Sequence, residues 1–128
     1  MSLVLIVDDN EDIRETLSLL LEDGGDTVLT APDGREALRC LRLRPLPDVV
    51  ILDLMMPVMS GWEMREEMLR DPAVASIPTI VMTGDRSWSV EAGRLHAAAS
   101  LAKPFEAEEM FSALDRVKLR QRARSGGP

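Results

Sequence analysis

Five short apolar segments, each followed by a stretch with helical periodicity, constrain the fold more than any other feature of this sequence. The apolar segments cover residues 3–7, 27–30, 49–52, 78–82 and 100–102. The first and third are apolar on both faces and rich in branched side chains, which is typical of strands buried in a parallel sheet. Strands that alternate with helices over short connections favour a parallel sheet covered on both faces. We therefore expect an α/β fold.

The stretches between these segments predict five helices. Their expected ranges are about 10–23, from 33 to just before Pro45, 60–70, 87–97 and 106–120. Asp33 and Ser60 are each followed three residues later by Glu, which is the spacing of a capping box at a helix start. The fourth helix contains Ser87, Ser89 and Gly93, so we expect it to be short or mobile.

The length of 128 residues is that of one domain. We expect this domain to cover residues 1–121 and a disordered tail to cover 122–128, which ends in Ser-Gly-Gly-Pro. The longest unbroken apolar run, 3–7, is too short to cross a membrane, and the N-terminus lacks the basic flank of a signal peptide. The single cysteine, Cys40, excludes an internal disulfide. The sequence therefore predicts a cytoplasmic protein without a membrane partner.

The net charge is −7, and its distribution is uneven. Five of the 15 basic residues lie after Asp115, so the preceding part of the chain carries −12. Such an acidic body argues against direct binding to a nucleic acid. The basic residues include only two lysines, Lys103 and Lys118.

Polar residues that carry chemistry follow four of the five predicted strands. Asp8 and Asp9 follow the first strand, Asp53 the third, Thr83 the fourth and Lys103 the fifth. In open parallel sheets, ligands bind beyond the carboxyl ends of the strands. We therefore expect three carboxylates, a hydroxyl and an ammonium group to meet at one edge of the sheet.

Three carboxylates at one site repel each other unless a proton or a cation is present. Carboxylates with open coordination positions suit Mg²⁺, which keeps waters for a phosphoryl oxygen. A lysine and a hydroxyl can donate to phosphoryl oxygens, and a carboxylate can itself be the nucleophile that forms an aspartyl phosphate. The residues alone thus predict phosphoryl chemistry supported by Mg²⁺ or Mn²⁺.

This set of residues resembles the receiver domain of response regulators in two-component signalling. The stretch Asp-Leu-Met-Met-Pro-Val-Met-Ser-Gly at 53–61 is similar to the most specific segment of that family. Residues 7–10 and 102–105 and the pair Asp33-Gly34 also match, and the resemblance extends to about residue 120. It implies a CheY-like, flavodoxin-like doubly wound sheet of five parallel strands in the order 2-1-3-4-5, flanked by five helices.

The resemblance also implies how a metal would be held. Asp9 would bind Mg²⁺ directly together with Asp53, and Asp8 would hold it through water. The backbone carbonyl of Met55 would be a third protein ligand. The Lys103–Pro104 bond would be cis, as is usual in the family.

The implied function is that of a phospho-accepting switch rather than an enzyme with a separate substrate. Asp53 would accept the phosphoryl group from a sensor histidine kinase or a phosphotransfer protein, and Thr83 and Lys103 would hold that group. The domain would catalyse only its own phosphorylation and dephosphorylation. We expect a stand-alone receiver that docks to another protein, whose identity the sequence does not give.

Two other functions compete with this interpretation. A pseudo-receiver would be a purely structural interaction module, but its usual sign is a lost acceptor or lost acids. A phosphatase of the haloacid-dehalogenase type also uses an aspartyl nucleophile, Mg²⁺, Thr and Lys. Its first motif needs two acids separated by one residue, whereas Asp8 and Asp9 are adjacent.

The sequence departs from the receiver family at the position three residues before Lys103. The family usually carries Tyr or Phe there, whereas this chain has Ser100. The preceding stretch, 95–99, also lacks the usual Gly-Ala pair. An aromatic switch is therefore absent, which puts the signalling face in doubt but not the phosphorylation site.

Overall fold

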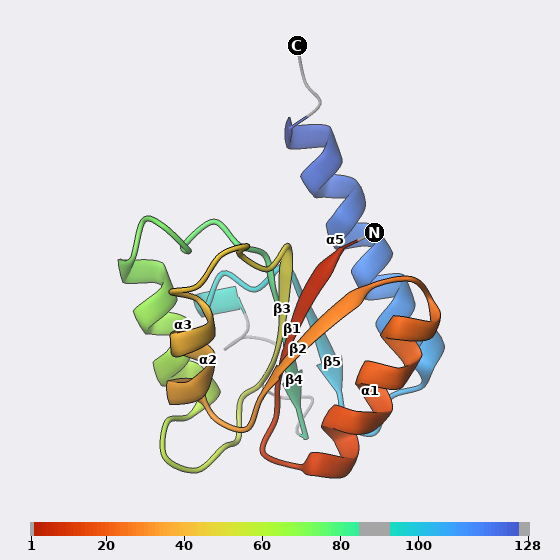
Figure 1. Cartoon of the computed structure of the whole chain (residues 1–128), viewed down its shortest axis with the longest axis horizontal. Coiled ribbons are helices and arrows are strands. Elements are labelled where there is room, and N and C mark those ends of the chain that lie inside the picture. Colours follow the sequence, from red (N-terminus) through yellow and green to blue (C-terminus); the bar gives the residue numbers. More distant parts are fainter. Residues whose placement is uncertain (1, 85–92, 126–128) are drawn as a thin grey trace.

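The computed structural model describes residues 2–84 and 93–125, and of residues 122–125 it describes the backbone alone. Strands and helices alternate along the chain (Figure 1). The elements are β1 (Leu3–Val7), α1 (Glu11–Asp23), β2 (Thr27–Ala31), α2 (Gly34–Cys40), β3 (Val49–Asp53), α3 (Gly61–Arg70), β4 (Thr79–Thr83), β5 (Ala99–Ala102) and α5 (Ala107–Ser125).

The five strands form one parallel sheet in the order β2-β1-β3-β4-β5, which confirms the predicted fold class and strand order. Helices α2 and α3 cover one face of the sheet, and α1 and α5 cover the other (Figure 1). Because all strands run in the same direction, their carboxyl ends share one edge of the sheet. β2 and β5 are the two outer strands.

Two hydrophobic cores fill the space between the sheet and its helices. Alternate residues of β1 enter different cores: Val4 and Ile6 pack towards α1 and α5, whereas Leu5 and Val7 pack towards α2 and α3. β3 and β4 are buried at every position. Burial on both faces explains why these strands appear in the sequence as unbroken apolar runs.

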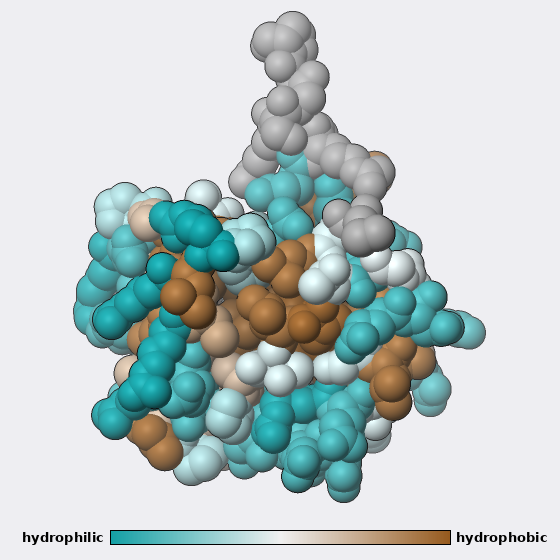
Figure 2. Space-filling model, in the orientation of Figure 1, coloured by the Kyte–Doolittle hydropathy of each residue, from teal (hydrophilic) through white to brown (hydrophobic). Residues whose placement is uncertain are grey.

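The outer strand β2 is less covered than the central strands, and three of its five residues are exposed. Figure 2 shows hydrophilic residues over much of this face, with hydrophobic residues gathered between the two helical layers. Leu29 of β2 and Leu19 of α1 are among the exposed large hydrophobic residues. Leu29 therefore adds some apolar surface at the edge of the sheet, and Leu19 adds more on the outside of α1.

Side-chain caps set the starts of the helices. Asn10 accepts from the Ile13 N–H at the start of α1, and Asp33 accepts from the Glu36 N–H at the start of α2. Ser60 forms a complete capping box at the start of α3. The two helix starts predicted from capping-box spacing are thus confirmed, although only Ser60 forms both bonds of the box among the described contacts.

The helices differ from the sequence-based expectation at two places. The structure describes four full helices, and the fifth, expected over 87–97, falls mostly outside the described residues; only positions 93 and 94 are described as helical. The last helix was expected to end near residue 120, but α5 continues to Ser125, through part of the expected tail. Arg, Gln and Ala favour helix, so the helix propagates beyond the turns that pack on the sheet. The division of the chain at residue 121 stays a prediction.

Among the described residues, no helix combines the length and the apolar character that crossing a bilayer requires.

Candidate functional site

Three acidic side chains meet at the carboxyl edge of the sheet, as the sequence predicted. Asp8 and Asp9 follow β1 directly, and Asp53 ends β3, the neighbouring strand. Each offers a carboxylate oxygen, and these oxygens lie within 4.8 Å of one another. Asp8 and Asp53 are buried whereas Asp9 is exposed, so the cluster opens to solvent on the side of Asp9.

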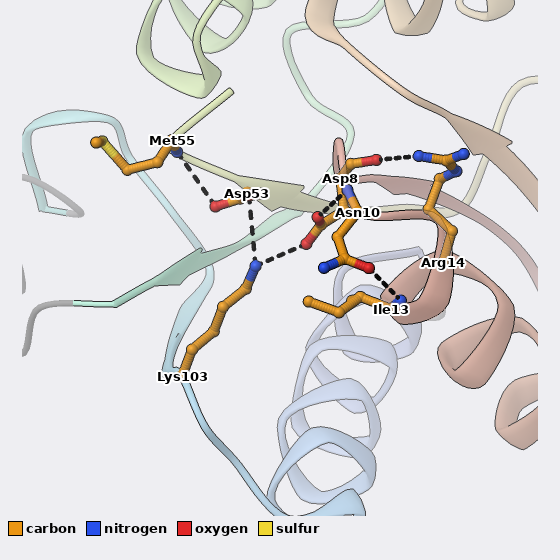
Figure 3. A network of polar contacts seen from close by, with 7 residues as sticks. All are labelled: Asp8, Asn10, Ile13, Arg14, Asp53, Met55 and Lys103. Atoms are coloured by element: carbon orange, nitrogen blue, oxygen red, sulfur yellow. Dashed lines mark hydrogen bonds and ion pairs between the residues drawn. The ribbon is translucent and has the colours of Figure 1, made fainter. Parts of the chain in front are cut away.

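Asp8 is held at three points (Figure 3). Its Oδ1 accepts from the Asn10 N–H at 2.9 Å, and its Oδ2 accepts from the Lys103 Nζ at 2.7 Å. Its backbone carbonyl accepts from the Arg14 Nη1 at 2.8 Å. Both carboxylate oxygens of Asp8 thus accept from protein donors, whereas Asp9 is the exposed member of the cluster and is open to direct contact with a cation.

Lys103 lies between two of the acids. Its ammonium nitrogen is 2.7 Å from Asp8 Oδ2 and 3.4 Å from Asp53 Oδ2 (Figure 3). Burial alone would lower the pKa of Lys103, but the hydrogen bond to Asp8 and the charges of Asp53 and Asp8 outweigh burial and raise it. Lys103 thus stays a cation that offsets part of the negative charge of the cluster.

Asp53 is positioned by its own loop as well as by Lys103. Its Oδ1 accepts from the Met55 N–H at 3.1 Å, while the Met55 side chain is 58% exposed. Burial and the charge of Asp8 raise the pKa of Asp53 above its ordinary value, although Lys103 and the Met55 N–H act in the opposite direction. The site therefore stabilises the ionised form of Asp53 less than water does, unless a cation binds.

Thr83 ends β4 and is buried at the same edge of the sheet. Its register partner in β5 is Ala102, and its carbonyl accepts from the Lys103 N–H at 2.7 Å. Thr83 and Lys103 are thus neighbours across two paired strands. The structure brings together all the site residues expected from the sequence: Asp8, Asp9, Asp53, Met55, Thr83 and Lys103.

The loop from β3 to α3 has an unusual backbone at Val58. This residue is 70% exposed and has a φ of 68°, in the left-handed region that β-branched residues avoid. The Met59 N–H donates to the Pro57 carbonyl at 2.7 Å across it. Such a three-residue turn is strained, and here it lies in the loop that follows Asp53.

Other residues considered in the sequence have ordinary surroundings. Ser100 is exposed, and Cys40 is partly buried beside the core of α2 and α3. The Lys103–Pro104 bond is cis, as expected.

Sequence analysis missed one buried charge, Arg65 of α3. This residue is 3% exposed, and its guanidinium group bonds to a threonine hydroxyl and two backbone carbonyls. A signal was available, because Arg65 shares helical spacing with Gly61, Met64 and Met68, which are also buried. A charged residue on an apolar helix face marks an internal polar contact.

The donor set fits a hard divalent cation. Two carboxylates that share one opening, with a backbone carbonyl in the same loop, supply the oxygen ligands that Mg²⁺ or Mn²⁺ takes in proteins. The raised pKa of Asp53 fits the same conclusion, since a bound cation would favour its ionised form.

Comparison with known proteins identifies the family. The sequence model of the response regulator receiver domain matches residues 4–115. A high-resolution structure of the chemotaxis response regulator CheY4 of Vibrio cholerae superposes with a TM-score of 0.85 at 37% identity, and the match covers 91% of this chain and 98% of that one. This chain belongs to the response regulator receiver domain family, whose members are signalling switches of two-component systems with an acidic pocket for Mg²⁺.

The curated relatives are of two lengths. Protein PilH of Pseudomonas aeruginosa is 30% identical over 122 residues, which cover 91% of this chain and 98% of PilH. The DNA-binding dual master transcriptional regulator RpaA of Synechocystis sp. is 33% identical over 117 residues, 88% of this chain but 47% of RpaA. The chain spans about half the length of several relatives it matches. The expectation that no nucleic acid is involved is therefore not confirmed and stays a prediction.

Proposed function

We propose that this receiver domain is a phospho-accepting switch in which Asp53 takes a phosphoryl group from a histidine kinase or phosphotransfer protein. The observation that carries this proposal is the position of the Lys103 ammonium between Asp8 and Asp53. One cation of the protein already bridges the acceptor and a neighbouring acid, and it can turn to the oxygens of a phosphoryl group.

The transfer step follows from the chemistry of the groups. A carboxylate oxygen of Asp53 forms the new bond to phosphorus while the bond from phosphorus to the donor imidazole nitrogen breaks, and that nitrogen keeps the electron pair. Thr83 and Lys103 donate to the phosphoryl oxygens, which fixes the group in line with the acceptor. The switch is turned off in a separate step: water attacks phosphorus, the bond from phosphorus to the Asp53 oxygen breaks, and inorganic phosphate leaves while Asp53 becomes a carboxylate again.

A bound Mg²⁺ or Mn²⁺ would neutralise negative charge on the phosphoryl oxygens during transfer. Asp9, Asp53 and the Met55 carbonyl would hold the ion directly. Asp8, whose carboxylate oxygens accept from Asn10 and Lys103, would act through water.

An apolar groove beside the site fits the donor protein. It has a volume of about 460 Å³ and lies between α1 and the loop from β5 to α5. Ile13, Leu17, Pro104 and Phe105 line its apolar part, and Lys103 borders it. A helix that carries the phosphohistidine and packs in this groove would lie beside Asp53, because Lys103 both lines the groove and contacts Asp53. The donor, the downstream target and a cytoplasmic location stay predictions for this chain.

Phosphorylation of the intact chain tests the proposal. The protein is mixed with acetyl phosphate and Mg²⁺, and its mass is read with Asp53→Asn as the control. A single phosphoryl adduct is expected on the native chain only, and only with Mg²⁺. If no adduct forms and beryllofluoride causes no spectral change, the chain is an interaction module without phosphoryl transfer. Release of phosphate from a generic phosphomonoester would instead favour a phosphatase.

The groove is tested separately with Phe105→Ala. This variant should accept phosphate from acetyl phosphate at the native rate but more slowly from a phosphorylated protein donor, because only the protein donor needs the groove. Equal loss with both donors would remove the groove from the proposal.

A further inference from the structure

Arg65 carries a buried positive charge that the proposed chemistry does not use. Its Nε donates to the Leu95 carbonyl at 2.9 Å, its Nη1 to Thr79 Oγ1 at 3.0 Å and its Nη2 to the His96 carbonyl at 3.2 Å. None of the ion pairs found among the described residues includes Arg65. Burial lowers its pKa, but a guanidinium group stays protonated in proteins. Three neutral acceptors thus stabilise this cation.

The three acceptors share a location at the amino ends of β4 and β5. Thr79 is the first residue of β4, and Leu95 and His96 lie just before β5. Arg65 therefore hydrogen-bonds to the first residue of β4 and to the residues just before β5. The carboxyl ends of the same two strands lead to Thr83 and Lys103, which are expected to bind the phosphoryl group.

The helix of Arg65 is itself fixed to the acceptor strand. Gly61, which begins α3, donates its N–H to the Leu54 carbonyl at 3.1 Å, immediately after Asp53. Arg65 lies one turn further along α3. The helix thus connects the acceptor, at its first residue, with the starts of β4 and β5, at its second turn.

The backbone of His96 adopts a left-handed conformation that the hydrogen bond from Arg65 helps to stabilise. His96 has a φ of 53°, a conformation that costs a residue other than glycine free energy. The charge-assisted bond from Arg65 to its carbonyl stabilises that conformation. The neighbouring Leu95 packs with Leu54 and Val81 in a small cluster on the same side of the sheet.

Within the part of the chain that the structure describes, β5 has few other anchors on this side. Ser100 pairs with Val81 in the register of β4 and β5, so it lies on the same face, and it is small and exposed. The outer strand therefore depends on the segment before it for its attachment to α3.

We propose that Arg65 is a positioning residue for phosphoryl transfer: it holds the starts of β4 and β5 on α3 and so keeps Thr83 and Lys103 aligned with Asp53. This inference rests on the proposed function of the site. Arg65 touches neither the acceptor nor the phosphoryl group and acts through the two strands.

The test compares Arg65→Met with Arg70→Met on the same helix. Arg70 has a side chain that is 70% exposed and pairs with Glu67, so it serves as the matched control. Arg65→Met should lower the rate of phosphorylation by acetyl phosphate about tenfold, because misaligned groups lose rate steeply. Its Mg²⁺ affinity, measured by titration calorimetry, should not fall, because Asp8, Asp9 and Asp53 belong to β1, β3 and the residues directly after β1, which Arg65 does not contact. Hydrogen exchange of the amides in 96–102 should become faster. Arg70→Met should change none of these.

A rescue separates positioning from general destabilisation. Adding His96→Gly to Arg65→Met should restore part of the rate and of the exchange protection, because glycine adopts a positive φ without the help of Arg65. Thr79→Val removes one acceptor and keeps Arg65 in place, so it gives a smaller loss of rate if Arg65→Met does not fold.

Three results would overturn the inference. Equal phosphorylation rates and equal hydrogen exchange in the Arg65→Met and Arg70→Met variants would show that the hydrogen bonds of Arg65 are not needed for transfer. A parallel loss of Mg²⁺ affinity and phosphorylation rate in Arg65→Met would show a general structural role. If Arg65→Met does not fold, a native phosphorylation rate in Thr79→Val would show the same. If the native chain forms no phosphoryl adduct, the proposed function fails first, while exchange still reports whether Arg65 orders β5.

Discussion

Gly61, the first residue of α3, lies against the backbone carbonyl of Asp53, the last residue of β3. A Cβ at position 61 would overlap that carbonyl oxygen and would come within 2.6 Å of the Leu54 Cα. Both neighbours are backbone atoms, which cannot turn away as a flexible side chain can. The start of α3 and the acceptor thus share a contact that only glycine allows.

Gly61→Ala should push α3 away from β3 and lower the free energy of unfolding by about 2 kcal/mol, which is within the range for overpacked interiors. The Mg²⁺ affinity should fall as well, because the backbone of Asp53 must move. Urea denaturation and calorimetric titration measure the two effects. Gly93→Ala is the control, since an added Cβ there meets nothing within 4 Å. Equal stability of the two variants would contradict the close contact.

Asp53→Asn should stabilise the metal-free protein at neutral pH by about 1 kcal/mol, because it removes a buried like charge. The folded state raises the pKa of Asp53 above the ordinary value of 3.8. The native chain therefore loses stability as the pH rises through the folded pKa, and keeps its full stability below the unfolded pKa. Asn does not titrate, so the advantage of the variant should disappear in acid. A difference that stays constant from acid to neutral pH in urea denaturation would contradict this assignment.

Lys103→Met should increase the affinity for Mg²⁺ and reduce phosphorylation. The ammonium group competes with a cation for Asp8 and Asp53, so its removal leaves these carboxylates to the metal. Without metal, the variant should be less stable by about 1–2 kcal/mol, less than for a fully buried pair because Lys103 is partly exposed.

The other lysine of the chain is the control for this prediction. Lys118 pairs with Asp26 and makes no contact with the site, so Lys118→Met should leave the Mg²⁺ affinity unchanged. Calorimetric titration of both variants decides the matter; a weaker affinity in Lys103→Met would mean that the lysine helps to hold the metal.

Val58→Asn should raise the free energy of unfolding by about 1 kcal/mol. Asn tolerates a positive φ, whereas a β-branched residue is strained there. Because Val58 is largely exposed, its replacement removes little buried surface. Val58→Thr keeps the branch at Cβ and should give no gain. Thermal unfolding of the two variants under the same conditions distinguishes relief of strain from a change in polarity.

The sequence predicted the strands well because both faces of each central strand are buried. An unbroken apolar run of only four residues, such as 49–52, is too short for a buried helix and is typical of a buried strand. The location of the site could be predicted from the strands, since Asp53 ends β3 and Asp8 and Lys103 directly follow β1 and β5. The order of the strands came with the family resemblance, because five buried runs look alike in any order.

The contacts of Arg65 and the backbone of Val58 could not be predicted in the same way. The acceptors of Arg65 come from residues 14 to 31 positions away in the chain, so no local pattern announces them. The φ of Val58 is imposed by the closure of its loop, not by the preference of valine. The end of α5 differs from the expectation for another reason: the residues after Arg120 include helix formers, so the helix continues although the last residues of the chain are typical of a tail.

The cluster of Asp8, Asp9 and Asp53 also bears on evolution. Replacing Asp53 with a neutral residue is expected to strengthen the fold, so drift under selection for stability alone would tend to erase this member of the cluster. The chain nevertheless keeps all three acids, together with the lysine that offsets them. Such a costly arrangement is expected where use, and not folding, has been the object of selection.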